Sequence, residues 1–249
     1  MVESGNGELG RWCAVATEAI AVGVEADADA SVRAYEGWRL RDLAVHVLRV
    51  YRNATIALRS GSLERPRPQL PVEPDDAPSR LGEAVRAALA EVEAALVACD
   101  HDLVWTPVGP RGAEFWRRRI LREAVLHRWD AQQARGTATV PEVVQALELI
   151  DEFLDTDVPR ALIAGEHQGS GVVVIGAEPR AWTVDLGSRV VARDAPVADG
   201  TASVSGDAAS VWLWLMRRDD HPGPVVVDDP DGSAAAFTAM IDRFNRPKR

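Results

Sequence analysis

The sequence contains few cysteines: only Cys13 and Cys99 occur among its 249 residues, and no CxxC pair is present. This scarcity excludes a disulfide framework and a cysteine-ligated zinc site. We interpret both residues as small core side chains. Because oxidising compartments favour disulfides, a reducing cytoplasmic location is the simplest expectation.

Long apolar runs and a surplus of basic charge are also absent. No apolar stretch approaches the roughly 20 residues of a membrane helix, and the first residues lack the basic and apolar regions of a signal peptide. The net charge of −10 argues against a nucleic-acid partner, since such binding needs a positive face. No GxGxxG, Walker A, GxSxG or HExxH motif is found, so nucleotide binding, serine hydrolysis and zincin chemistry lack support.

What the sequence has in abundance is apolar helical periodicity. Hydrophobic residues make up 47% of the chain, which is typical of a packed globular protein. The proline-rich segment 61–78 must be a loop. Apolar residues recur at helical spacing in the first two-thirds of the chain. They predict five helices that begin near Glu8, Leu40, Ser79, Ala113 and Pro141, with Ser79 as an N-cap.

The pattern changes after Gly169, where short alternating segments replace the long helical ones. Such alternation is typical of strands. A mixture of short strands and helices predicts an α+β domain. We therefore expect a helical domain over 1–166 and an α+β domain over 170–249. Strands are predicted at 172–175, 181–186, 189–193, 202–205 and 225–227, with helices at 208–217 and 232–244.

Three side chains of the helical region form a candidate metal site. Glu123 and His127 are four residues apart on one predicted helix, so they share a face. His127 falls in the apolar stripe of that helix, and His46 lies at the edge of the stripe of another helix. Helical bundles build metal sites from inward side chains on facing helices. Two imidazoles and one carboxylate suit zinc or another divalent ion, and they leave a coordination position open.

The same residues also have ordinary explanations. A Glu/His pair at this spacing is often a surface ion pair, and an interior histidine is often a hydrogen-bonded core residue. Spacing alone does not join His46 to the other two residues. Asp130, three residues after His127, is either a partner that orients the imidazole or half of a surface ion pair. The cluster Arg117, Arg118, Arg119 and Arg122 is interpreted mostly as a solvated helix face, although one or two arginines could hold a substrate carboxylate.

Two stretches of the helical region carry a family resemblance. Residues 37–46 read GWRLRDLAVH, which resembles the W-x-x-x-D-L-x-x-H signature of the mycothiol-dependent maleylpyruvate isomerase family. Residues 118–131 read RRILREAVLHRWDA, similar to the family's R-R-x-x-x-E-x-x-x-H-R-W-D-A block. A weaker likeness follows in VSGDA at 204–208 and LWLMRR at 213–218.

The resemblance implies a fold and a set of roles. It implies a DinB-like up-down four-helix bundle followed by a smaller α+β domain that is SCP2-like, that is, similar to a sterol carrier protein. It makes His46, Glu123 and His127 the ligands of one divalent metal, zinc by expectation. It implies mycothiol, the actinobacterial counterpart of glutathione, as a thiol cosubstrate. It also points to Arg217 as a catalytic residue, although Met216 stands where the family has glycine.

The leading hypothesis is therefore a metal- and mycothiol-dependent isomerase or S-transferase. Its substrate would be a small, anionic electrophile attacked by a metal-activated thiolate. One alternative is a thiol-independent metalloenzyme that uses the open position for water or substrate, because one fold can host several chemistries. The other is a non-catalytic protein that binds a small ligand. A monomer or a homodimer is expected, with no nucleic-acid or membrane partner.

Overall fold

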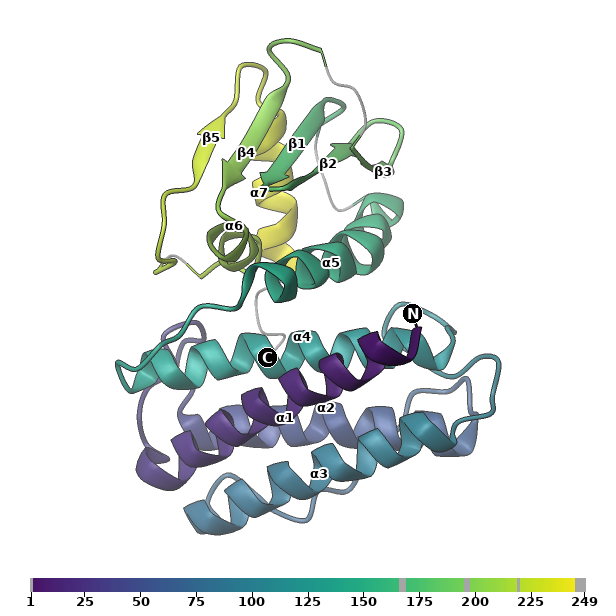
Figure 1. The fold of residues 1–249 in the computed structure, drawn as a ribbon, viewed down its shortest axis with the longest axis vertical. Helices are drawn as coiled ribbons and strands as arrows, with labels where there is room; N and C mark the ends of the chain where they lie inside the picture. Colours follow the sequence, from purple (N-terminus) through teal and green to yellow (C-terminus); the bar gives the residue numbers. More distant parts are fainter. Residues whose placement is uncertain (1, 166–168, 195–197, 219, 245–249) are drawn as a thin grey trace. The chain divides into compact units, whose positions relative to one another are not determined.

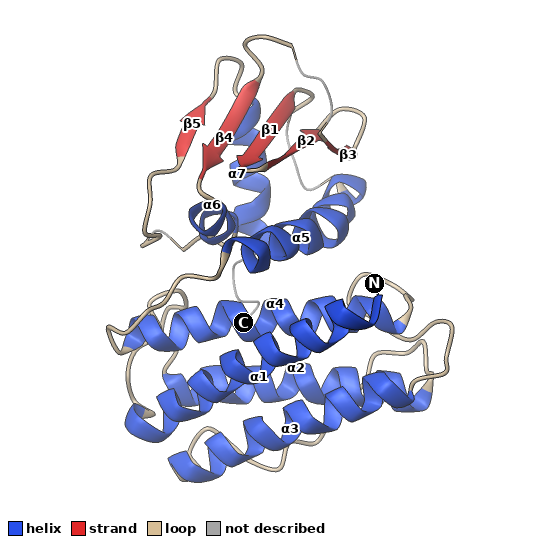
Figure 2. Ribbon diagram, in the orientation of Figure 1, coloured by secondary structure: helices blue, strands red, loops and turns tan. Residues whose placement is uncertain are grey.

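The computed structural model describes residues 2–165, 169–194, 198–218 and 220–244. Seven helices and one five-stranded sheet are assigned in these ranges (Figure 2). The chain divides into two compact units, Met1–Thr139 and Val140–Arg249, and each is considered by itself. In the described part of the chain, no helix is both long enough and apolar enough to cross a membrane.

The first unit consists of four helices (Figure 1): α1 Val2–Asp27, α2 Leu40–Ser60, α3 Pro78–Ala98 and α4 Ala113–Ala134. Helices α1 and α2 each pack against both α3 and α4. Each helix turns an apolar stripe inward, as its 3.6-residue period requires. The largest fully buried side chains of this core include Ile20, Leu43, Leu48, Tyr51, Leu81 and Trp116.

Local residue chemistry explains where these helices begin and end. Pro78 occupies the first turn of α3, where its fixed φ is favourable and its missing N–H costs nothing. The prediction that Ser79 caps this helix is therefore wrong, because the N-cap is Ala77. Helix α2 ends at Gly61 with φ +62°, and a Cβ there would lie only 2.7 Å from the ring of His101. That position accordingly requires glycine.

The second unit combines three helices with a mixed sheet. Its helices are α5 Val143–Ala164, α6 Ala208–Leu215 and α7 Ser233–Phe244. Strand β1 pairs parallel with β4, and the remaining neighbours pair antiparallel in the order β3-β2-β1-β4-β5. The strands are β1 Val172–Ala177, β2 Arg180–Asp185, β3 Val190–Arg193, β4 Ala202–Gly206 and β5 Val226–Asp228.

One face of this sheet forms the core of the second unit. Alternate residues of β1, including Val173 and Ile175, are fully buried, as are Trp182 and Val184 of β2. Helices α6 and α7 both contact β1 and β4. The period-two alternation of the sequence therefore correctly predicted strands, since one face is apolar and covered.

The fifth helix belongs to a different unit from the one expected. It was predicted within a helical domain over 1–166, whereas α5 groups with the sheet and contacts α6, α7 and β3. Periodicity shows that a helix has an apolar face, but not which element covers it. The predicted boundary at 166–170 partly lies outside the described residues, which exclude 166–168.

Candidate metal centre

The structure brings together the three predicted metal ligands. Each of His46, Glu123 and His127 offers one ligand atom, and these atoms all lie within 4.8 Å of one another. The Oε2 atom of Glu123 lies 3.3 Å from Nε2 of His127 and 3.6 Å from Nε2 of His46. The contact of α2 with α4 thus supplies the association of His46 with the other two that sequence spacing left open.

A buried carboxylate orients His127. Nδ1 of His127 lies 3.0 Å from Oδ2 of Asp130, and the His127 and Asp130 side chains are 1% and 2% exposed. Because an ionised carboxylate only accepts hydrogen bonds, this contact places the imidazole proton on Nδ1. When His127 is neutral, its lone pair is then on Nε2, the atom that faces Glu123. Asp130 is therefore not half of an exposed surface ion pair.

The protonation states of Glu123 and His127 affect each other, because the two side chains are in contact. Burial alone would raise the pKa of Glu123, but hydrogen bonds from His127 and His46 and the charge of Arg119 hold that pKa well below its usual value. Burial opposes protonation of His127, yet its hydrogen bonds to Asp130 and Glu123 raise its pKa. The carboxylate is therefore ionised, and it favours positive charge between the ligand atoms.

Aromatic rings border the centre, and its three candidate ligands differ in exposure. The ring of Trp38 lies 5.4 Å from that of His46, and the ring of Tyr35 lies 6.1 Å from that of His127. The His46 side chain remains 34% exposed and that of Glu123 17%. The centre is therefore less deeply buried on the His46 side than on the His127 side.

The donor set fits a divalent transition metal. In a tetrahedral zinc site with bonds of about 2.0–2.1 Å, neighbouring ligand atoms are about 3.4 Å apart. The separations of 3.3 and 3.6 Å between Glu123 and the two imidazoles are close to this value. Three protein ligands leave one tetrahedral position for an exogenous ligand. The residues present therefore suit an open zinc-type centre.

The arginine cluster of α4 is less solvated than expected. Arg119 and Arg122 are buried, with exposed fractions of 7% and 6%, so the interpretation as a solvated face is wrong for these two residues. Arg119 Nη1 lies 3.6 Å from Glu123 Oε1, and its guanidinium lies over the ring of Phe115. The sequence signal for this role was its position four residues before Glu123. Arg117 pairs with Glu114 instead.

Arg217 lies in the second unit, directly after α6. It adopts a positive φ of 58°, pairs with Asp242 of α7 and stacks over the ring of Trp214. These contacts account for its position in the fold. Its predicted catalytic role stays a prediction.

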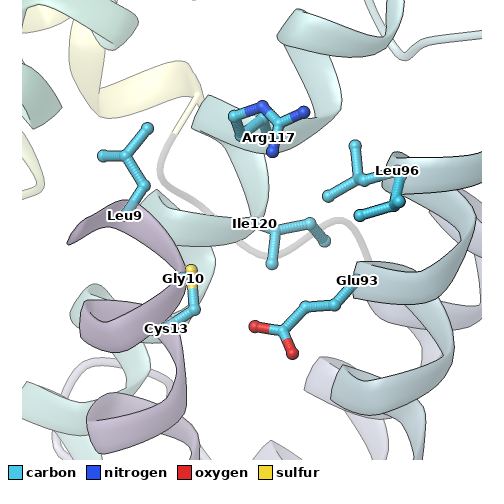
Figure 3. Close-up of a pocket in the computed structure, with 8 residues that line it drawn as sticks. Leu9, Gly10, Cys13, Glu93, Leu96, Arg117 and Ile120 are labelled. Atoms are coloured by element: carbon cyan, nitrogen blue, oxygen red, sulfur yellow. The ribbon is translucent and has the colours of Figure 1, made fainter. Parts of the chain in front are cut away.

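A separate small cavity of about 180 Å³ lies between α1, α3 and α4 (Figure 3). None of the three metal-binding candidates lines it. Cys13 on its wall is only 5% exposed, and burial raises the pKa of its thiol to about 12. Cys13 is thus an inert core residue, as predicted. Cys99 is only partly buried, so the core interpretation does not hold for it.

The helical unit presents two imidazoles and a carboxylate, and the second unit contains a mixed five-stranded sheet. Together these features define a candidate metalloprotein of two units. Residues 11–132 match the family described as mycothiol maleylpyruvate isomerase N-terminal domain. This match assigns the helical unit, over residues 11–132, to that domain family.

Two solved structures support this assignment at the level of the fold. A mycothiol-dependent maleylpyruvate isomerase is 18% identical, with a TM-score of 0.58. A histidine-to-alanine variant of that kind of enzyme is 16% identical, with a TM-score of 0.60. Each match covers 88% of this chain and 92% of the other. The shared fold therefore extends over both units.

One curated protein also shows sequence similarity. The glycine cleavage system H protein of Methylococcus capsulatus is 28% identical over 102 residues, which cover 40% of this chain and 80% of that protein. This identity and coverage do not define a family.

Proposed function

We propose that this protein is a metal-dependent isomerase that uses a thiol cosubstrate, mycothiol, on a small electrophilic substrate. One observation carries the proposal: the ligand atoms of His46, Glu123 and His127 all lie within 4.8 Å of one another, and the His46 side chain is 34% exposed. The match of residues 11–132 to this family's N-terminal domain supports mycothiol as the thiol and an anionic alkene such as maleylpyruvate as the substrate. The protein would act as a monomer or a homodimer in a reducing cytoplasm.

The chain's own residues would hold and tune the metal. His46 and His127 present Nε2 lone pairs, and Glu123 presents an ionised carboxylate. A divalent cation at this point would lower the pKa of a thiol, and a thiolate can add reversibly to an activated alkene. Asp130 keeps the proton of His127 on Nδ1, so that Nε2 stays available. The rings of Trp38 and Tyr35 restrict water on their side of the centre.

Elemental analysis and a thiol-dependence assay test the proposal. The wild type should contain about one metal per chain, and His46→Ala and His127→Ala variants should lose it. Isomerisation of maleylpyruvate, followed by ultraviolet absorbance, should require both the metal and mycothiol. His101→Ala is a matched control, because this histidine of the same unit pairs with Asp100 and is remote from the ligand set.

Each other outcome has a definite meaning. Full activity without added thiol would replace the proposal with a thiol-independent metalloenzyme. Metal bound without any turnover of electrophilic alkenes would favour a small-ligand-binding protein. Absence of metal after reconstitution with zinc would overturn the metal centre itself.

A further inference from the structure

A wide groove lies beside α2, where the helix faces the proline-rich segment that follows it. Its volume is about 740 Å³, and its walls include Arg49 and Asn53 of α2 together with Glu64, Arg65 and Arg67 of the segment. Small-molecule sites commonly measure about 300–1,000 Å³. The groove is therefore large enough for a metabolite.

The arginines of this groove are not neutralised by the protein. The ion pairs and hydrogen bonds of the described residues include no partner for Arg49, Arg65 or Arg67. The neighbouring Arg52, by contrast, pairs with Glu91 at 3.3 Å. Three arginines and one glutamate give the groove a local charge of +2, whereas the whole chain carries −10. A concentrated positive charge in an acidic protein favours an anionic ligand.

Asn53 provides a second, independent observation. Its Oδ1 atom is buried and has no hydrogen-bond partner within the described structure. A buried acceptor without a donor is unfavourable. Asn53 therefore places an unsatisfied polar atom beneath the wall of the groove.

The α2 wall of the groove begins at Arg49, three residues after His46. His46, Arg49 and Asn53 are spaced at i, i+3 and i+7, so they share one face of α2. With a rise of 1.5 Å per residue, Arg49 is about 4.5 Å and Asn53 about 10 Å from His46 along the helix axis. Helical side chains lean toward the N-terminus, which directs Arg49 toward His46.

From this arrangement we infer that the groove is a carboxylate subsite of the helical unit. Arg49 and Arg65 pair with the carboxylate of a small organic acid, since guanidinium forks match carboxylate geometry. This assigns anion recognition to α2 and the following segment, independently of Arg217 in the other unit. The end of the acid that is not held by the arginines would reach the metal centre, and this part of the inference rests on the proposed function.

Calorimetric titration of the metal-loaded full chain with succinate tests the subsite. Arg49→Gln and Arg65→Gln should each weaken binding up to about 5-fold, the usual range for exposed ion pairs, and the double variant should weaken it further. Succinamide, which has the same length but no charge, should not bind. Arg59→Gln is the matched control, because Arg59 is exposed on the same helix and does not line the groove.

The outcomes separate this inference from the proposed function. Equal succinate affinity in the wild type and the double variant overturns the subsite, including the case in which succinate binds only to the metal. No binding to the wild type also overturns it. Arginine-dependent binding to a protein that shows no thiol-dependent isomerisation keeps the subsite and rejects the proposed function. Thiol-dependent isomerisation together with succinate binding that does not depend on the arginines keeps the proposed function and rejects the subsite.

Discussion

Glu123 of the helical unit and Asp151 of the sheet unit are both carboxylates in protected surroundings, but their partners differ. Asp151 accepts hydrogen bonds from Arg180 at 2.6 Å, Arg193 at 2.7 Å and Trp182 Nε1 at 2.9 Å. Glu123 faces two imidazole nitrogens at 3.3 and 3.6 Å and one arginine at 3.6 Å.

This difference separates a structural anchor from a binding centre. The partners of Asp151 are permanent donors, so its carboxylate is satisfied and fixes α5 to β2 and β3. Two of the partners of Glu123 are imidazoles, which are also acceptors when neutral. Their lone pairs and the carboxylate require a proton or a metal ion between them. A buried carboxylate whose hydrogen-bond donors are all present therefore stabilises the fold, whereas a carboxylate that faces other acceptors indicates a ligand-binding site.

The largest expected effect is the loss of metal from Glu123→Gln. The amide keeps the size of the side chain but removes the charge, so zinc affinity should fall about 1,000-fold or more. That exceeds the 10- to 100-fold typical of residues that only orient ligands. Competition with a chelating dye measures it. Asp151→Asn should leave the affinity unchanged, and an equal loss in both variants would remove the distinction between the two sites.

The second prediction concerns the stability of the protein, which should depend strongly on Asp151. Asp151→Ala leaves two arginines and an indole without their acceptor, and it should lower the free energy of unfolding by about 2–4 kcal/mol. Urea denaturation measures this change. Asp155→Ala is the control, because the more exposed Asp155 also pairs with Arg193 but should contribute less than about 1 kcal/mol. A small effect of Asp151→Ala would show that the anchor is dispensable.

Asp130→Asn should weaken metal binding by about 10- to 100-fold, the usual cost of losing a carboxylate that orients a histidine ligand. The amide can still contact Nδ1 of His127, but it no longer fixes the tautomer. The dye competition used for Glu123 measures the effect. If the affinity is unchanged, Asp130 has only a packing role.

Metal affinity should also fall as the pH is lowered. The pKa of His127 is raised in the metal-free protein, so protons compete with the metal once the pH drops below that pKa. The loss is then about tenfold per pH unit for each displaced proton. In the metal-free protein, the stability that comes from protonated His127 is present at low pH and disappears as the pH rises through its pKa. Dye titrations across a pH series test this, and a flat profile would contradict the assigned protonation.

The smallest expected effect is a change in the stability of the helical unit, which contains Glu123, on replacing a helical glycine with alanine. Gly10 lies within α1, and a Cβ there would meet its nearest atom, Oε1 of Glu93, at 3.7 Å. Gly10→Ala should stabilise the protein by about 0.5–1 kcal/mol through helix propensity. Gly82→Ala in α3 should lack this gain, because its Cβ would collide with Glu25, which Arg86 holds. Thermal unfolding of both variants measures the difference.

The sequence-based predictions are accurate where a feature depends on neighbouring residues, and they fail where it depends on segments far apart in the chain. The starts of α2 and α4 were predicted to the residue, because prolines, glycines and apolar periodicity act locally. Arg119 was misjudged because charge suggests solvent exposure, whereas its partner Glu123 and the ring of Phe115 lie inward. The assignment of α5 failed for a similar reason, since its partner strands follow it in the sequence.

The sequence by itself determined the elements, the Glu123–His127 pair on one helical face and the family resemblance. Each depends on periodicity and spacing within a short segment. Only the tertiary structure decided that His46 joins that pair, that α5 packs on the sheet, and that the arginines of α2 and its following segment surround one groove. These are contacts between segments far apart in the chain, and they are selected by the packing of complete apolar faces rather than by any local pattern.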